Sequence, residues 1–169
     1  FFKEVRPEAL TSDVLKVGQV ELVLDAERLP FPDGSLANIV FMSVLHHLRE
    51  PFRFFEEAER ALAPGGRVVF TEPYVSRLSY FVYKYLHHEP CEISGGVGPG
   101  GPLGCGNLAV PSVLFGRRRA EFERRFPGLR LLGVTYHDVF LYILSGGCNY
   151  RSFAPGILFP LLRLVERVL

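Results

Sequence analysis

Short apolar runs that end in polar residues recur along the first half of the chain. One run covers residues 20–24 and ends at Asp25, and another covers residues 39–42 and ends at Ser43. Runs that are apolar on both faces are typical of parallel strands covered by helices. In open sheets of this kind, ligands bind outside the carboxyl ends of the strands. The pattern therefore predicts an α/β protein whose site forms where these strands end.

The same pattern predicts the neighbouring elements. A short strand is expected over residues 9–15, and a buried strand over residues 67–71. Between them, a helix should begin at Pro51 and carry an apolar stripe before Pro64-Gly65-Gly66 stops it. Further helices are expected over residues 1–6, 74–87, 117–126 and 157–169, and two adjacent strands over residues 129–136 and 139–144.

Several short motifs stand in a recognisable order. They are Asp25-Ala26, Leu29-Pro30-Phe31, Asp33, Ser35, Val44-Leu45-His46-His47-Leu48 and Leu62-Ala63-Pro64-Gly65-Gly66. In order and spacing, these motifs resemble the class I S-adenosylmethionine-dependent methyltransferases, in particular the methyltransferase type 11-like domain. The resemblance implies a Rossmann-like, mostly parallel sheet with an antiparallel C-terminal strand pair. One departure is that Ala37 and Asn38 stand where the family usually has an aspartate.

The start of the chain departs further from the family. The family grips its cofactor with a glycine-rich turn between its first strand and first helix, where backbone N–H groups need the close approach that glycine allows. No such turn precedes Phe1, and residues 1–6 read as the tail of the helix that would follow it. We therefore expect an N-terminally truncated domain that lacks the first strand and the turn, and that is inactive as a fragment.

The resemblance assigns two strand-end aspartates to the cofactor S-adenosylmethionine. Asp13 would take the ribose hydroxyls, because a carboxylate offers two acceptor oxygens to two neighbouring O–H donors. Asp25 would lie near the exocyclic amine of the adenine, with Ala26 small enough to let the flat ring approach. The alternative for both aspartates is that they form turns.

The second strand end supplies the remaining candidates for cofactor contact, namely Ser43, Leu45 and His46. His47 is the candidate catalytic base, because imidazole titrates near neutrality. The alternative is that one histidine lines the pocket while the other packs or caps. We expect no metal site, because adjacent histidines point to different sides of a backbone and no other ligand stands at a recognised spacing.

Substrate contacts are expected beyond the strand over residues 67–71. Glu72 and Tyr74 stand at its carboxyl end, although Glu72 could equally cap the helix over residues 74–87. Farther on, residues 94–106 contain a literal G-x-G-x-x-G, but prolines interrupt it and no strand precedes it. We interpret about residues 91–106 as a glycine-rich surface insertion or lid.

Composition limits the classes of function. With 169 residues, 48% hydrophobic and 22% charged, the chain fits one domain, with a methyltransferase part over residues 1–150 and a final amphipathic helix over residues 151–169. A formal charge of +1 does not favour nucleic acid as a partner. Three cysteines without C-x-x-C spacing favour a reducing, cytoplasmic setting. No membrane-spanning run or signal peptide is visible.

The function that these features predict is methyl transfer from S-adenosylmethionine to a small or lipid-like acceptor. Two alternatives stay open: a catalytically dead, methyltransferase-like binding module, and a nucleotide-binding oxidoreductase. The last helix is apolar beyond one narrow stripe, which predicts a bulky apolar acceptor or a peripheral membrane contact. The alternative is that this helix packs on the sheet.

Overall fold

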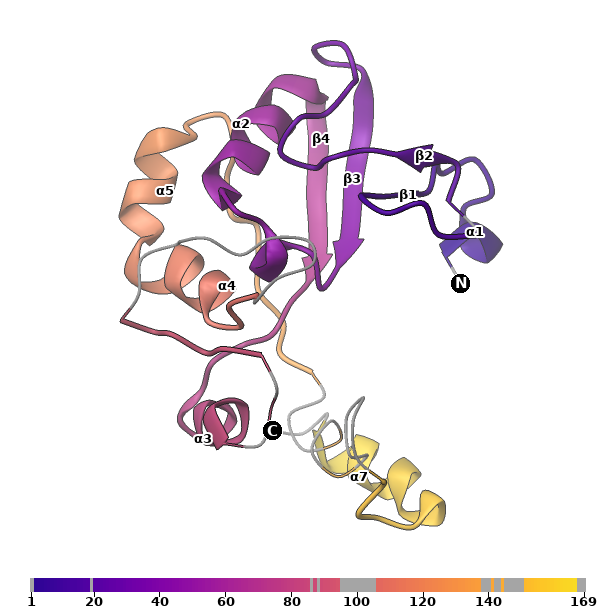
Figure 1. Cartoon of the computed structure of the whole chain (residues 1–169), viewed down its shortest axis with the longest axis vertical. Coiled ribbons are helices and arrows are strands. Elements are labelled where there is room, and N and C mark those ends of the chain that lie inside the picture. The colour runs from indigo at the N-terminus through magenta and orange to yellow at the C-terminus, as the bar shows by residue number, and fades with distance from the viewer. Residues whose placement is uncertain are drawn as a thin grey trace.

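The computed structural model describes residues 2–18, 20–85, 87, 89–94, 106–137, 141, 144 and 151–166. Strands and helices alternate through the first half of the chain, and helices dominate the second half (Figure 1). The elements are α1 (Phe2–Val5), β1 (Ser12–Asp13), β2 (Leu22–Val23), β3 (Leu36–Met42), η1 (Leu45–His47), α2 (Pro51–Ala61), β4 (Leu62–Thr71), α3 (Arg77–Tyr85), α4 (Val110–Ser112), η2 (Val113–Arg117), α5 (Arg119–Arg125), η3 (Gly156–Leu158) and α7 (Phe159–Glu166).

The described strands form two parallel pairs. β1 pairs with β2, and β3 pairs with β4 in a longer ladder that runs to Met42 opposite Thr71. Figure 1 shows β3 and β4 side by side with their arrowheads at the same end, while β1 and β2 lie to one side of β3. The predicted parallel α/β class is confirmed. The single continuous sheet is not, because the described strands belong to two separate two-stranded sheets.

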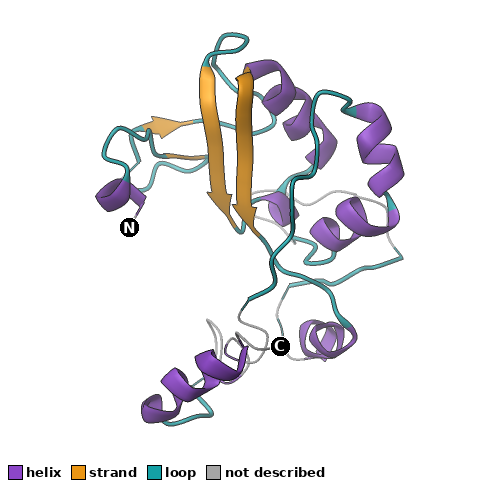
Figure 2. Cartoon of the chain, turned by 180° about the vertical axis from the view of Figure 1, so that it is seen from behind, coloured by secondary structure: helices purple, strands orange, loops and turns teal. Residues whose placement is uncertain are grey.

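One face of the β3–β4 pair is covered by helices. Ile39, Phe41, Val68 and Phe70 point toward α2 and pack against the main core. The alternate residues point the other way, and Met42 is 70% exposed. The apolar runs led us to expect cover on both faces, but the described helices α2, α4 and α5 gather on one side of this pair (Figure 2).

The main core is built from phenylalanines. Phe41 stacks on Phe70 across the strand pair with ring centroids 5.0 Å apart, and Phe55 from α2 meets Phe122 from α5 at 4.8 Å. α2 begins at Pro51 as predicted, because a proline at the first helical position loses no hydrogen bond. Its apolar residues Phe52, Phe55 and Ala58 are buried in the main core.

The predicted antiparallel strand pair is not confirmed. Residues 129–137 belong to no strand, and Leu141 and Leu144 are helical, while the rest of residues 139–144 lies outside the described residues. Residues 129–137 pass beside β4 in both views without a ladder (Figures 1 and 2). An alternating pattern becomes a strand only where backbone groups find a partner, and here Leu132 and Val134 stay exposed.

The region of the predicted glycine-rich insertion is anchored at both ends. Cys91 is buried in a second core cluster with Leu108, Ala109 and Val113, and Gly106 is also buried. Residues 95–105, which contain most of the predicted lid, lie outside the described residues. None of the helices in the described part of the chain has the length and apolar character needed to cross a lipid bilayer.

Candidate functional site

The turn after β3 is sharp and strained. Ser43 adopts a positive φ of 53°, a conformation that residues other than glycine rarely take. Its N–H donates to the carbonyl of Thr71 at 2.9 Å, which ties the turn to the end of β4. The chain then enters η1, where Leu45 is fully buried in the main core. The turn therefore delivers His46 and His47 to the carboxyl end of the strand pair.

Glu72, directly after β4, organises this end of the sheet. One carboxylate oxygen accepts the N–H groups of Val44 at 2.7 Å and Leu45 at 2.6 Å, and the other lies 2.5 Å from Nδ1 of His46. Both the Glu72 and His46 side chains are only 3% exposed. Glu72 thus caps η1 and not the helix after it, because its carboxylate lies between these three nitrogen atoms.

The helix cap that was the alternative role of Glu72 is made by serines instead. Ser76 and Ser79 exchange hydrogen bonds at the start of α3: the N–H of Ser79 donates to Oγ of Ser76 at 3.1 Å, and the N–H of Ser76 donates to Oγ of Ser79 at 2.7 Å. A serine hydroxyl can accept an orphan N–H of the first turn, which is the usual role of an N-cap residue.

His46 and His47 lie together, although they are adjacent in the sequence. Their ring centroids are 4.1 Å apart with planes tilted by 40°. Glu89, from the segment after α3, faces both rings: Nε2 of His47 is 3.6 Å from one carboxylate oxygen and Nε2 of His46 is 3.9 Å from the other. The premise that adjacent histidines diverge is wrong here, because the tight η1 turn lets both rings lean toward one carboxylate.

The electrostatics favour a neutral His47. Burial lowers the pKa of His47, and the neighbouring His46 lowers it further, whereas Glu89 and Glu72 act in the opposite direction. A lowered pKa keeps the imidazole uncharged at neutral pH, with a lone pair on one ring nitrogen. His47 is also the more exposed of the two rings, so it is the one that a ligand can reach.

Asp13 and Asp25 occupy the carboxyl end of the other strand pair. Each is exposed and each accepts a local N–H: Leu15 donates to Asp13 at 2.8 Å, and Glu27 donates to Asp25 at 2.9 Å. These contacts realise the turn-forming alternative. They occupy one oxygen of each carboxylate, and a carboxylate can accept about four hydrogen bonds. The remaining acceptor positions therefore still fit the O–H and N–H donors of a nucleoside, while Ala26 packs against the main core.

Tyr74 lies past the end of β4, half exposed, with its ring 4.4 Å from that of Tyr136. The hydrogen bond to Tyr74 raises the pKa of Tyr136, and burial adds to the shift. The sequence predicted Tyr74 as a substrate contact but did not identify Tyr136 as its partner. The two rings form an exposed aromatic surface near the strand ends.

Arg60 holds a loop in place, a role that the sequence did not predict because its helix face was interpreted as solvated. Its guanidinium donates to the carbonyls of Leu29 at 3.1 Å and Phe31 at 2.8 Å, and to the carboxylate of Asp33 at 2.7 Å. The hydrogen bond to Glu57 raises the pKa of Arg60, and the bond to Asp33 adds to this. Arg60 therefore holds the Leu-Pro-Phe-Pro-Asp loop against α2, which explains why that motif keeps its shape.

These strand ends define an α/β domain with acidic and imidazole groups where parallel strands stop. Residues 4–70 match the family described as a methyltransferase domain, and that segment contains both strand pairs and η1. Over residues 4–70 the chain is similar to a methyltransferase domain, and this similarity is consistent with the class I S-adenosylmethionine-dependent enzymes. The resemblance read from the motifs is confirmed, and the family implies methyl transfer.

One relative adds a short similarity. A protein of Streptomyces fradiae, described as an uncharacterized 37.1 kDa protein in transposon TN4556, is 43% identical over 49 residues. The match covers 29% of this chain and 14% of that protein. No solved structure matches the chain.

Proposed function

We propose that this protein transfers a methyl group from S-adenosylmethionine to a small or lipid-like acceptor. The observation that carries the proposal is the coincidence of the family match over residues 4–70 with two exposed aspartates at the carboxyl ends of parallel strands. S-adenosylmethionine supplies a methyl group on a positively charged sulfur. The protein's task is then to hold the nucleoside and to align the acceptor.

The nucleoside side of the proposed site is the β1–β2 end. Asp13 would accept the ribose hydroxyls, and Asp25 would accept from the adenine amine. The local bonds to the N–H groups of Leu15 and Glu27 orient each carboxylate before a ligand arrives. A side chain that is already fixed loses less conformational freedom on binding. Ser43, exposed at the end of β3, is a further candidate for cofactor contact from the other strand pair.

Calorimetric titration of S-adenosylmethionine into the full-length protein tests the proposal. The variants Asp13→Asn and Asp25→Asn keep one carbonyl oxygen for the local N–H but lose the charge and the spare acceptors. Each should weaken binding at least tenfold, whereas Glu123→Gln, an exposed acid paired with Arg119 on α5, should bind as the parent does.

Three results would count against the proposal. Equal affinity in all variants would remove the aspartates from the site. Binding without transfer to any acceptor would favour the dead binding module. Binding of a nicotinamide dinucleotide in place of S-adenosylmethionine would favour the oxidoreductase.

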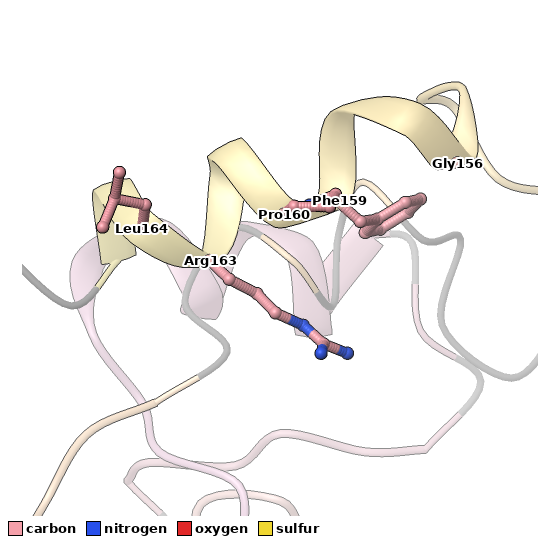
Figure 3. A pocket seen from close by; sticks show the side chains of 5 residues that line it. All are labelled: Gly156, Phe159, Pro160, Arg163 and Leu164. Carbon is pink, nitrogen blue, oxygen red and sulfur yellow. The ribbon is translucent and has the colours of Figure 1, made fainter.

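The C-terminal helix supports the acceptor part of the proposal. A hollow of about 540 Å³ lies along η3 and α7 and is lined by Gly156, Phe159, Pro160, Arg163 and Leu164. Figure 3 shows the Arg163 side chain extending away from the helix, about one turn after Phe159. An apolar surface with a cation beside it suits an amphiphilic acceptor or an anionic lipid headgroup. We also propose that the protein is cytoplasmic and that this helix makes a peripheral contact with a membrane.

Co-sedimentation with vesicles tests the membrane contact. Leu164 is 59% exposed, so Leu164→Glu removes apolar surface and adds a negative charge without disturbing a core. The parent protein should pellet with vesicles that contain anionic lipid, and this variant should stay in the supernatant. The matched control is Val134→Glu, which is equally exposed but lies outside α7. Equal recovery with and without vesicles would leave only packing against the protein as the helix's role.

A further inference from the structure

A cluster of three possible metal ligands forms beside the end of β4. Nε2 of His46, Nε2 of His47 and the Glu89 carboxylate come from two segments far apart in the sequence, and their ligand atoms lie within 4.8 Å of one another. We propose that His46, His47 and Glu89 bind a divalent transition metal, with zinc as the best fit. This site goes beyond methyl transfer and does not depend on it.

The distances between the ligand atoms of the cluster leave a small space between them, which is the arrangement of ligands around an ion. The two histidine-to-carboxylate distances, 3.6 and 3.9 Å, exceed the roughly 2.7–3.2 Å of a direct hydrogen bond. Zinc binds imidazole nitrogen and carboxylate oxygen at about 2.0–2.2 Å, which puts neighbouring ligands of a tetrahedral ion about 3.4 Å apart. Side-chain rotations that move the ligand atoms by up to about 1 Å would therefore close the cluster around an ion.

Glu72 sets His46 in the form that a metal requires. A carboxylate is acceptor-only, so the 2.5 Å contact places the proton of His46 on Nδ1. In a neutral ring with this tautomer, the lone pair is on Nε2, the atom that faces Glu89. Metal-binding histidines commonly donate their other N–H to a carboxylate in this way, which fixes the ring and strengthens it as a ligand. Glu72 is thus a positioning residue for the proposed site.

The remaining two ligands are also held in place. The N–H of Glu89 donates to Nδ1 of His87 at 3.2 Å, and the Glu89 carboxylate is 19% exposed. His47 is packed from the other side by Gly106, where an added Cβ would lie 2.7 Å from Nδ1 of the ring. The N–H of Asn107 donates to the carbonyl of His46 at 2.9 Å, so this segment closes over η1. Glycine is required at residue 106 for the ring to stay where it is.

The chemistry of the set selects the class of ion. Two imidazoles and one carboxylate suit zinc and ferrous iron rather than calcium or magnesium, which prefer oxygen ligands. Three protein ligands leave the fourth position of a tetrahedral ion for water, and the partial exposure of His47 and Glu89 gives water access. In this proposal His47 is a metal ligand. A neutral imidazole can also act as a catalytic base, which is the role that the sequence predicted for His47.

Metal titration of the full-length protein, after removal of metal with a chelator, tests the proposal. Zinc chloride should bind at one site per chain with micromolar or tighter affinity, and cobalt chloride should give the visible absorption of a tetrahedral complex. Glu89→Gln and His47→Gln should each weaken zinc binding at least tenfold. The control Glu92→Gln, an exposed acid from the same segment, should bind as the parent does.

Two further variants separate positioning from folding. Glu72→Gln should reduce zinc affinity by about 10- to 100-fold, the usual effect of losing the carboxylate behind a histidine ligand. Gly106→Ala should also reduce it, whereas Gly116→Ala, whose added Cβ would meet open space, should not. Zinc should raise the melting temperature of the parent but not of Glu89→Gln, which checks binding without relying on the titration.

The proposal is overturned if zinc fails to bind at one site per chain, or if Glu89→Gln and His47→Gln bind zinc as tightly as Glu92→Gln. Either result would make the cluster a network of histidines and carboxylates that holds the turn. S-adenosylmethionine binding by the same samples is measured separately, so failure here leaves the methyl-transfer proposal standing.

Discussion

The carboxylates at the ends of the two parallel strand pairs differ in their burial and in their hydrogen-bond partners. Glu72, at the end of β4, is buried and accepts from groups far away in the sequence. Asp13 in β1 and Asp25 just after β2 are exposed, and each carboxylate accepts an N–H from the residue two positions on, its one partner among the described residues. The carboxylate at the end of β4 is therefore held within the fold. The carboxylates at the β1–β2 end are oriented by a local hydrogen bond and are exposed. The difference teaches that a carboxylate at a strand end is available to a ligand only where the fold leaves some of its acceptor positions unoccupied.

The largest expected effect is a loss of stability when Glu72, the buried carboxylate at the end of β4, is replaced. Glu72→Ala leaves the N–H groups of Val44 and Leu45 and the ring of His46 without their acceptor, which should cost about 3–5 kcal/mol of the free energy of unfolding. Urea denaturation measures this. If Asp25→Ala proves equally damaging, the contrast between the two ends is false.

A smaller effect is expected at the turn that leads into η1. Ser43 has a positive φ, so the branched side chain in Ser43→Val should cost about 1–2 kcal/mol in the same urea experiment. Ser43→Gly should stay within about 1 kcal/mol of the parent, because glycine takes this conformation without strain but is freer when unfolded. Equal stabilities for the valine and glycine variants would show that the turn is not strained.

The smallest effect on the free energy of unfolding is expected for the exposed aspartates of the β1–β2 end. Asp13→Asn and Asp25→Asn should change the free energy of unfolding by less than about 0.5 kcal/mol, because an amide oxygen can still accept the N–H of the local turn. Circular dichroism during urea denaturation measures this. A loss comparable to that of Glu72→Ala would mean that these carboxylates hold the fold together.

Local signals in the sequence predicted local structure well. Pro51 marked the start of α2. Asp25 was predicted at a strand end because an apolar run stops there, and Asp13 was predicted near the end of the short strand over residues 9–15. The family resemblance rested on motifs within one stretch, and the match over residues 4–70 contains most of them.

Long-range contacts could not be predicted in the same way. Glu89 reaches the histidine pair from a segment far downstream, and Arg60 reaches across to the loop around Phe31. No periodicity connects such residues, because the fold alone brings them together. The predicted antiparallel pair is not confirmed for a related reason: alternation over residues 129–136 describes a side-chain pattern, while a strand also needs a backbone partner.

The most direct test of the central claim is a titration of S-adenosylmethionine into the isotope-labelled full-length protein, followed by amide resonances. The N–H groups of Leu15 and Glu27 donate to Asp13 and Asp25, so both resonances should shift as the ligand saturates. The N–H of Gly128 donates to the Glu59 carboxylate at 2.7 Å and serves as the matched control that should not move. Unchanged resonances of Leu15 and Glu27, with shifts elsewhere, would contradict the placement of the cofactor at the β1–β2 end.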